Sequence, residues 1–206
     1  MLTEIQRIAR VKAFVGHRTE AGHLPYQVEH VRQAVVETTN VDRVALFRVP
    51  SGECPIYGKY ELSRRETAPY TGMELHADVY FTDQLNYCWR RFVVTKELCQ
   101  CIFDVEAARV QTTKDVDQLV DMLRSQASSG GTAGWLPTAH SEQFSVWAAL
   151  EVLCPVEDRL KLQDAYNRQA LSTMQLARAF RIPVEYMTFA MENAFIDLGS
   201  QLFSNC

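Results

Sequence analysis

The sequence predicts an α+β fold in which a small mixed sheet is surrounded by helices. Helical patterns open and close the chain, and strand-like runs lie between residues 43 and 81. The 206 residues are 47% hydrophobic and 22% charged, which is enough apolar material for one domain to bury a core. We expect a single domain over 1–206, with an N-terminal helical pair (1–40), a core (41–155) and a C-terminal helical segment (156–206).

Two helices are predicted before residue 40, because apolar residues recur there every three or four positions. The first helix carries Leu2, Ile5, Ile8, Ala9 and Val15 on one face, and the second follows Pro25 with Val28, Val31, Ala34 and Val35. Three strand-like runs come next: VALFRV (44–49), which is followed by Pro50, then PIYGKYEL (55–62) and HADVYF (76–81). Their β-branched and aromatic residues predict the small sheet.

Helical patterns return after the strands. Residues 85–105 and 116–126 each predict a helix, whereas the glycine-rich and serine-rich SSGGTAG (128–134) predicts a mobile loop. HSEQFSVWAALEVLCP (140–155) predicts a helix that ends near Pro155, since proline disfavours a helical residue before it. The remainder is also predicted to be helical, with Pro183 opening the last helix.

Charge and composition argue against several kinds of partner. The net charge of -4 provides no general attraction to nucleic acid or to anionic lipid. No apolar run approaches the length of a membrane span, and the first residues mix charge with apolar side chains where a signal peptide would have an apolar core. We expect a cytoplasmic protein that binds neither nucleic acid nor membrane. The six cysteines lack paired spacing, which predicts reduced thiols within the core.

Three stretches, in this order, carry a resemblance to a known family. They are HADVYFTDQLNYCWRRFVVTKELCQCIFD (76–104), EQFSVWAALEVLCP (142–155) and LARAFRIPVEYMTFAMENAFIDLG (176–199). Together they resemble the ImmA/IrrE family of zinc metallopeptidases, in which a strand is followed by an arginine-phenylalanine pair and a helix bearing HExxH. The resemblance implies a zincin-like domain. In active members it implies a protease that cuts repressor-type regulators in mobile-element or stress control.

The zinc ligands of such a helix are replaced in this chain. The two histidine positions read Lys96 and Gln100. A lysine binds a metal only when it is deprotonated, and an amide is a weak zinc ligand beside imidazole. Glu97 stands at the general-base position, but that base acts on a metal-bound water. The resemblance aligns Glu142 with the third ligand, and His140 is a weaker candidate for the same pocket. We therefore expect no metal and no other cofactor, and we expect Glu97 to be inactive.

Two interpretations of the K-E-x-x-Q pattern remain open. The first is that the Lys96 ammonium takes the place of the zinc charge and pairs with Glu142 in the vacated pocket. The second is that the pattern is a solvated helix face. The two differ in an observable way, because an ion pair in a pocket requires both side chains to be buried and within hydrogen-bond distance.

Aromatic residues gather where the third strand-like run meets the following helix. They are Tyr80, Phe81, Tyr87, Trp89 and Phe92. Core packing is the simplest interpretation, and a groove for a partner peptide is the alternative. In the resembling family a substrate chain adds to an edge strand, and ADVYF (77–81) is expected to be that strand or its neighbour.

The C-terminal segment LSTMQLARAFRIPVEYMTFAMENAF (171–195) resembles a helix-turn-helix. A DNA-reading helix carries basic or amide side chains at its start, aimed at bases and phosphates. This second helix begins with VEYMTFAMEN, which contains two glutamates and neither lysine nor arginine. The pattern therefore favours a packing motif over DNA binding.

The sequence supports three functions from different classes. The first is a metallopeptidase-like protein that has lost its metal and acts by binding a regulatory protein partner. The second is an active metallopeptidase with ligands of another kind, drawn from Glu97, Glu142 and His140. The third is a phage-type structural or assembly protein that keeps only the scaffold. The sequence gives no indication of the oligomeric state.

Overall fold

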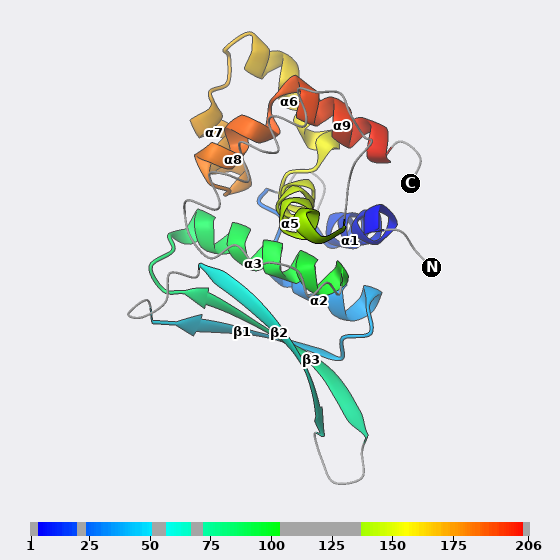
Figure 1. The fold of residues 1–206 in the computed structure, drawn as a ribbon. Coiled ribbons are helices and arrows are strands. Elements are labelled where there is room, and N and C mark those ends of the chain that lie inside the picture. Colours follow the sequence, from blue (N-terminus) through cyan, green and yellow to red (C-terminus); the bar gives the residue numbers. More distant parts are fainter. Residues whose placement is uncertain (1–3, 20–23, 51–56, 67–71, 104–136, 204–206) are drawn as a thin grey trace.

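Helices begin and end the described chain, and a three-stranded sheet lies between them in sequence (Figure 1). The computed structural model describes residues 4–19, 24–50, 57–66, 72–103 and 137–203. The fold is α+β, as predicted. The helix predicted at 116–126 and the loop predicted at 128–134 lie outside the described residues. The described elements are α1 (Glu4–Arg18), α2 (Val28–Thr38), β1 (Arg43–Val49), β2 (Gly58–Glu66), β3 (Met73–Thr82), α3 (Tyr87–Phe103), α5 (Pro137–Leu153), α6 (Val156–Asn167), α7 (Thr173–Phe180), α8 (Val184–Ala190) and α9 (Asn193–Phe203).

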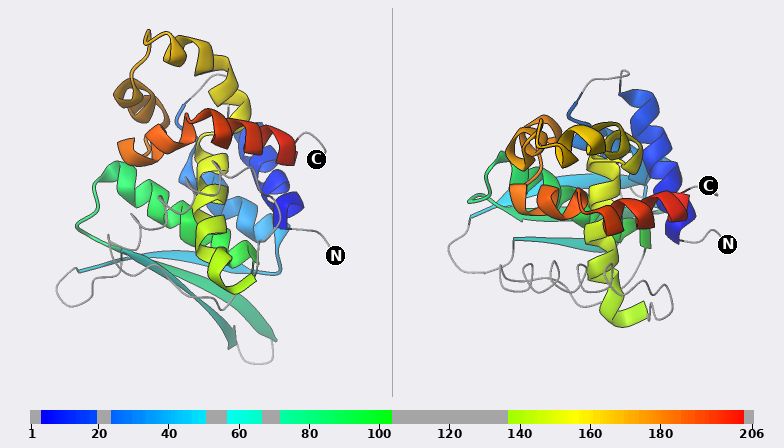
Figure 2. Two further views of the ribbon diagram at one scale, coloured as in Figure 1. Left: turned by 45° about the horizontal axis from the view of Figure 1, so that its top comes forward. Right: turned by 90° about the horizontal axis from the view of Figure 1, so that it is seen from above.

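The two predicted N-terminal helices are present and pack into the core. Helix α1 buries Ile8 and Val15, and α2 buries Val31 and Val35. These residues recur at helical spacing, so one stripe of each helix faces the interior. Helix α1 also lies close to α5 and α9, which come more than 100 residues later in the sequence (Figure 2).

The sheet is mixed and has the strand order β1-β3-β2. Strand β1 runs parallel to β3, with Leu46 opposite Val79, and β2 runs antiparallel to β3, with Tyr60 opposite the same residue. Because β3 is paired on both sides, ADVYF (77–81) is the central strand. The sequence analysis predicted that ADVYF is either an edge strand or the neighbour of one, and the structure shows that it is the neighbour.

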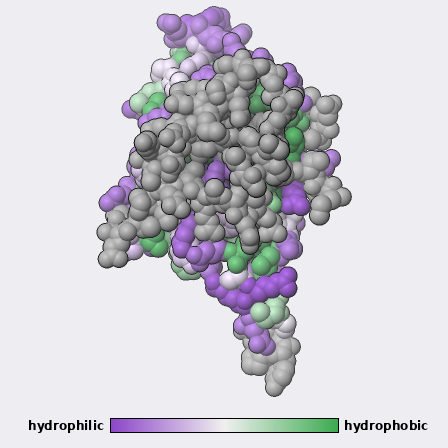
Figure 3. Space-filling model, viewed as in Figure 1, coloured by the Kyte–Doolittle hydropathy of each residue, from purple (hydrophilic) through white to green (hydrophobic). Residues whose placement is uncertain are grey.

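The described helices all lie on one side of the sheet (Figures 1 and 2). Helices α2 and α3 are nearest to the sheet, and α5 crosses over α3. Alternate residues of β3 point toward these helices, which leaves Ala77 and Val79 fully buried. The described ends of β2 and β3 that lie farthest from the helices carry hydrophilic residues beside apolar ones (Figure 3).

The arginine-phenylalanine pair at the start of α3 holds the C-terminal helices against the core. The Arg91 guanidinium donates to the carbonyl oxygens of Tyr26 (2.7 Å) and Arg181 (3.2 Å). The Phe92 ring stacks on Tyr186 with 3.9 Å between ring centroids. Trp89 meets the same tyrosine edge-on. Part of the predicted aromatic cluster is therefore core packing.

The C-terminal segment contains the predicted tight turn, but Pro183 does not open the last helix. Helix α7 begins with a capping box formed by Ser172 and Gln175 and ends at Arg181, which adopts the left-handed conformation (φ 56°). Helix α8 follows and stops at Ala190, after which α9 forms a separate helix. This break lets the Phe189 and Phe195 rings pack 4.3 Å apart between centroids, a tertiary contact that local helix propensity does not anticipate.

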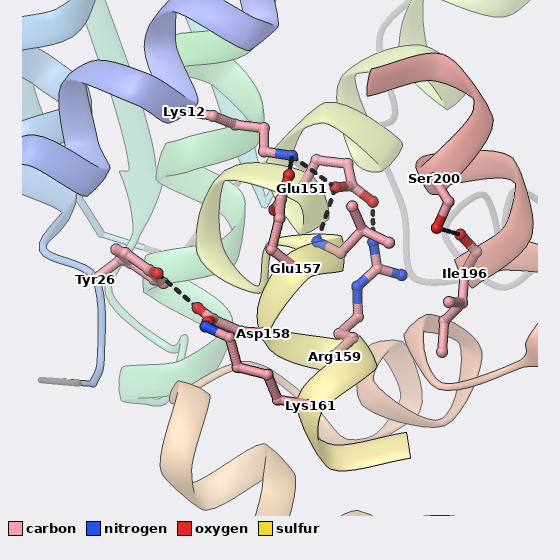
Figure 4. A network of polar contacts seen from close by, with 10 residues as sticks. Lys12, Tyr26, Glu151, Glu157, Asp158, Arg159, Lys161, Ile196 and Ser200 are labelled. Atoms are coloured by element: carbon pink, nitrogen blue, oxygen red, sulfur yellow. Dashed lines mark hydrogen bonds and ion pairs between the residues drawn. The ribbon is translucent and has the colours of Figure 1, made fainter. Parts of the chain in front are cut away.

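A buried charge network joins helices α1, α5 and α6 and reaches the end of α8 (Figure 4). The fully buried Glu151 accepts from the Arg159 guanidinium, from the Val156 backbone N–H (3.2 Å) and from the Lys12 ammonium (3.4 Å). Arg159 also donates to the Ala190 carbonyl oxygen (2.9 Å). Buried ionised groups are tolerated only when they are paired and hydrogen-bonded. The charged groups of this network pair with one another, so the network has a structural role in the fold.

The described cysteines are free thiols. Cys99, Cys101 and Cys154 are buried, and Cys88 is partly buried. This agrees with the predicted reduced, core-filling role. Among the described helices, none combines the length and the apolar character needed to cross a membrane.

Candidate functional site

From Arg91 onward helix α3 is buried on all sides, yet it carries consecutive polar residues. Every residue from Arg91 to Phe103 is buried. Within this run Lys96 is 6% exposed and Glu97 is 1% exposed. Removing charged side chains from water is costly unless each one finds a partner, so a cluster of this kind in a buried helix indicates a specific role.

The Lys96 ammonium lies between two carboxyl groups. Lys96 Nζ is 2.6 Å from Glu142 Oε2 on α5 and 3.0 Å from Glu97 Oε1 on its own helix. Glu142 is 46 residues away in sequence and meets Lys96 because α5 crosses α3. The ion pair predicted from the sequence is therefore present. The alternative of a solvated helix face is wrong, since Lys96, Glu97 and Glu142 are all buried.

Two opposing effects act on the charge of Lys96. Burial lowers its pKa, because an ammonium is less stable away from water. The carboxylates of Glu97 and Glu142 raise it, and the balance leaves the pKa of Lys96 above its ordinary value. The side chain is therefore a fixed positive charge at neutral pH.

Gln100 and His140 are the two other residues predicted to lie in the pocket, and the structure describes the side chain of Gln100 alone. Gln100 lies one helical turn after Lys96, is 5% exposed, and has a side-chain oxygen without a hydrogen-bond partner among the described residues. Glu142 Oε1 likewise lacks such a partner in this part of the chain. His140 belongs to α5, but its side chain is outside what the structure describes.

This set of donors does not fit zinc. Catalytic zinc is held by three nitrogen, sulfur or carboxylate ligands with one open position. Within the described ranges no group of three histidine, cysteine, aspartate or glutamate side chains is placed to hold a metal ion. The ammonium at 2.6 Å from Glu142 also supplies the charge that a cation would bring.

Gly58, which sequence reasoning did not single out, lets the sheet approach the site closely. It is the first residue of β2, and a Cβ added there would lie 2.4 Å from Val93 Cγ1 and 3.2 Å from Glu97 Oε1. A glycine at a strand position is the available sequence signal, because it often marks a close backbone approach. Gly58 therefore places the β2 backbone directly against the side chain of Glu97.

Replacing Gly58 with alanine is expected to lower the free energy of unfolding by about 1–3 kcal/mol, because the added methyl group overlaps Val93. Gly16 in α1 is the matched control, since nothing lies within 4 Å of a Cβ added there. Gly16→Ala is expected to stabilise by roughly 0.5–1 kcal/mol through helix propensity. Urea denaturation of both variants measures the difference. Equal effects in the two variants would contradict the close approach at Gly58.

Comparison with family models, with curated proteins and with solved structures gives no match to this chain. The function is therefore inferred from the geometry of the Lys96 site and from the resemblance of the three motifs to the ImmA/IrrE family.

Proposed function

We propose that this chain is a catalytically inactive, zincin-like protein of the ImmA/IrrE type that acts by binding a regulatory protein partner of the repressor type. One observation carries the proposal: Lys96 Nζ lies 2.6 Å from Glu142 and 3.0 Å from Glu97 inside a buried site. A lysine with two carboxyl partners replaces the charge of the metal, so the scaffold persists without the Lewis acid that hydrolysis requires.

The arrangement of the elements supports the zincin-like part of the proposal. The helix with the K-E-x-x-Q pattern lies against the sheet, and a second helix crosses it and contributes the carboxylate of Glu142. The Arg91–Phe92 pair precedes the pattern and ties the C-terminal helices to the helix that carries it. In the resembling family such a helix pair holds a zinc ion, and here the Lys96 ammonium lies between carboxyl groups of the two helices. A protein partner is inferred from the same resemblance, because active members act on repressor-type regulators.

The metal content of the purified chain tests the loss of the metal. The chain is expressed without an affinity tag, purified without chelator, and measured by elemental mass spectrometry. We expect zinc and other transition metals to be well below one equivalent, because an ammonium already neutralises Glu142. A full equivalent of zinc that disappears in Glu142→Gln would overturn the proposal and favour a metallopeptidase with other ligands.

The fate of a bound partner tests the loss of catalysis. Proteins captured with the intact chain are purified individually, mixed with it, and measured by intact mass. We expect a repressor-type regulator that forms a stable complex and keeps its full mass. A regulator that is cut at a defined bond, with or without added zinc, contradicts the proposed function.

A further inference from the structure

Strand β1 has one edge that no described strand covers. The Val49 carbonyl oxygen accepts from the Asp83 N–H (3.0 Å) on the side of β3, whereas the Val44 carbonyl oxygen accepts from Arg32 Nη1 (2.9 Å) on the opposite side. Backbone direction alternates along a strand, so Leu46 and Arg48 share the phase of Val44. Their N–H and C=O groups therefore point to the outer edge, beyond the part that α2 covers.

The uncovered part of this edge is apolar and exposed. Leu46 is 38% exposed and Phe47 is 40% exposed, which makes them two of the large hydrophobic side chains left at the surface of the described residues. Arg48 beside them is exposed as well. An exposed strand edge with apolar side chains is a template for pairing with another strand, and proteins normally cover or shorten such edges.

A cavity of about 230 Å³ opens beside Leu46, between β1, α2 and α3. Its walls include the apolar side chains of Val28, Phe81 and Val94, and Tyr87 and Arg90 complete one side of it. Phe81 and Tyr87 belong to the aromatic cluster noted in the sequence, so this part of the cluster lines a cavity. The space accommodates an apolar side chain from a strand placed along β1.

The surroundings of the cavity are positively charged. Within the described residues no carboxylate forms an ion pair with Arg48 or Arg90, and Arg91 is directed to backbone carbonyl oxygens. The single acidic residue in the lining, Glu29, is 2.5 Å from Arg32 and is neutralised by it. An acidic side chain on an incoming segment would therefore meet an uncompensated guanidinium.

We propose that the outer edge of β1 is a docking site for an extended segment of a protein partner. The segment adds a strand through the N–H and C=O groups of Leu46 and Arg48. It places an apolar side chain in the cavity and an acidic side chain, two positions away on the same face, beside Arg48 or Arg90. The inference rests on the proposed function in assuming a protein partner, but it does not involve the Lys96 pocket. Gly58, which contacts Glu97, lies on β2 at the opposite edge of the sheet.

A labelled synthetic peptide tests the site directly. The probe is an eight-residue peptide of alternating threonine and valine. One valine is replaced by leucine, and the valines two positions before and after it are replaced by glutamate, so that these three side chains share one face. Binding to the intact chain is measured by fluorescence anisotropy, and the amide signals of Leu46 and Arg48 are followed by NMR. We expect saturable binding with shifts centred on these two residues. We expect about tenfold weaker binding when the peptide amides that face β1 are N-methylated, because each loses a hydrogen bond.

Two protein variants separate the edge from its charge. Leu46→Pro removes a donor that points outward and leaves the β1–β3 ladder intact, so it should weaken binding about tenfold without unfolding the chain. Arg48→Glu should weaken binding of the glutamate peptide and strengthen binding of a matched peptide in which lysine replaces glutamate. If Leu46→Pro fails to fold, as judged by circular dichroism, the N-methylated peptide on the unaltered chain still decides the question.

Three results would overturn the inference. The first is absence of peptide binding to the unaltered chain, and the second is peptide binding that N-methylation does not weaken. The third is self-association in sedimentation that Arg48→Glu abolishes, because a second copy of the chain would then be the occupant of the edge. These results are independent of the metal measurement. A zinc equivalent in the unaltered chain would remove the proposed function and leave a positive peptide result standing, whereas a negative peptide result would leave the metal result unaffected.

Discussion

Lys96→Met is expected to lower the free energy of unfolding by about 3–5 kcal/mol, because it leaves buried carboxyl groups without their cation. Lys96, Glu97 and Glu142 are 6%, 1% and 6% exposed, so water cannot replace the ammonium. Methionine has similar length and fills the space of the lysine stem, which separates the loss of charge from the loss of packing. Urea denaturation of the variant and the unaltered chain measures the change.

Lys161→Met is the matched control for this prediction. Lys161 also forms an ion pair, with 2.7 Å between its Nζ and Asp158 Oδ1, but its side chain is 72% exposed. The two pairs therefore have similar distances and differ in burial. A much smaller change is expected at Lys161, since solvent screens an exposed pair. Similar losses in the two variants would show that the Lys96 site gains nothing from its burial.

Acidification is expected to restore part of the stability that Lys96→Met loses. In the unaltered chain the pKa of Lys96 is raised in the folded state, so its stabilising contribution is present at neutral pH and is lost only as alkaline pH passes that raised pKa. In Lys96→Met the carboxyl groups of Glu97 and Glu142 are buried without a cation, which favours their protonated form in the folded state. Stability of the variant relative to the unaltered chain is therefore expected to recover as the pH falls from neutral toward the unfolded glutamate pKa. No recovery on acidification would contradict buried, uncompensated carboxylates.

The double variant Lys96→His, Gln100→His is expected to bind one equivalent of zinc with a dissociation constant of about 1 μM or tighter, equivalent to about 8 kcal/mol. Histidines four residues apart on one helix face supply two ligands, and Glu142 on α5 supplies the third. The placement of Glu142 within 2.6 Å of the Lys96 ammonium shows that its carboxylate reaches this pocket. Zinc content after dialysis and the rise in melting temperature on zinc addition measure the effect.

Three further variants act as controls for zinc binding. Each single histidine variant retains only one new ligand and should bind zinc far more weakly. Glu142→Gln in the double-histidine background removes the third ligand and should lower the affinity strongly while the chain stays folded. If the double variant folds and binds no zinc, the positions of Lys96, Gln100 and Glu142 do not correspond to a metal site, and the proposed relationship to zinc metallopeptidases is wrong.

Much of the secondary structure was predictable because it depends on local patterns. The 3.6-residue spacing of Ile8 and Val15 and of Val31 and Val35 predicted α1 and α2, and these residues are buried as expected. The break between α8 and α9 was not predictable in this way. It brings the Phe189 and Phe195 rings together, a contact that the local spacing of apolar residues does not indicate.

The sequence by itself determined that the candidate site lacks the standard ligands of a zinc ion. Whether lysine and glutamine can hold zinc depends on their functional groups alone, so Lys96 and Gln100 already argued against a standard metal centre. The tertiary structure decided which group pairs with Lys96 and which strand edge no described strand covers. The Lys96–Glu142 pair joins residues 46 positions apart, and its burial depends on α5 crossing α3. The edge position of β1 depends on β3 pairing with both of the other strands. Contacts of this range have no periodic signal in the chain, because they are set by how whole elements pack.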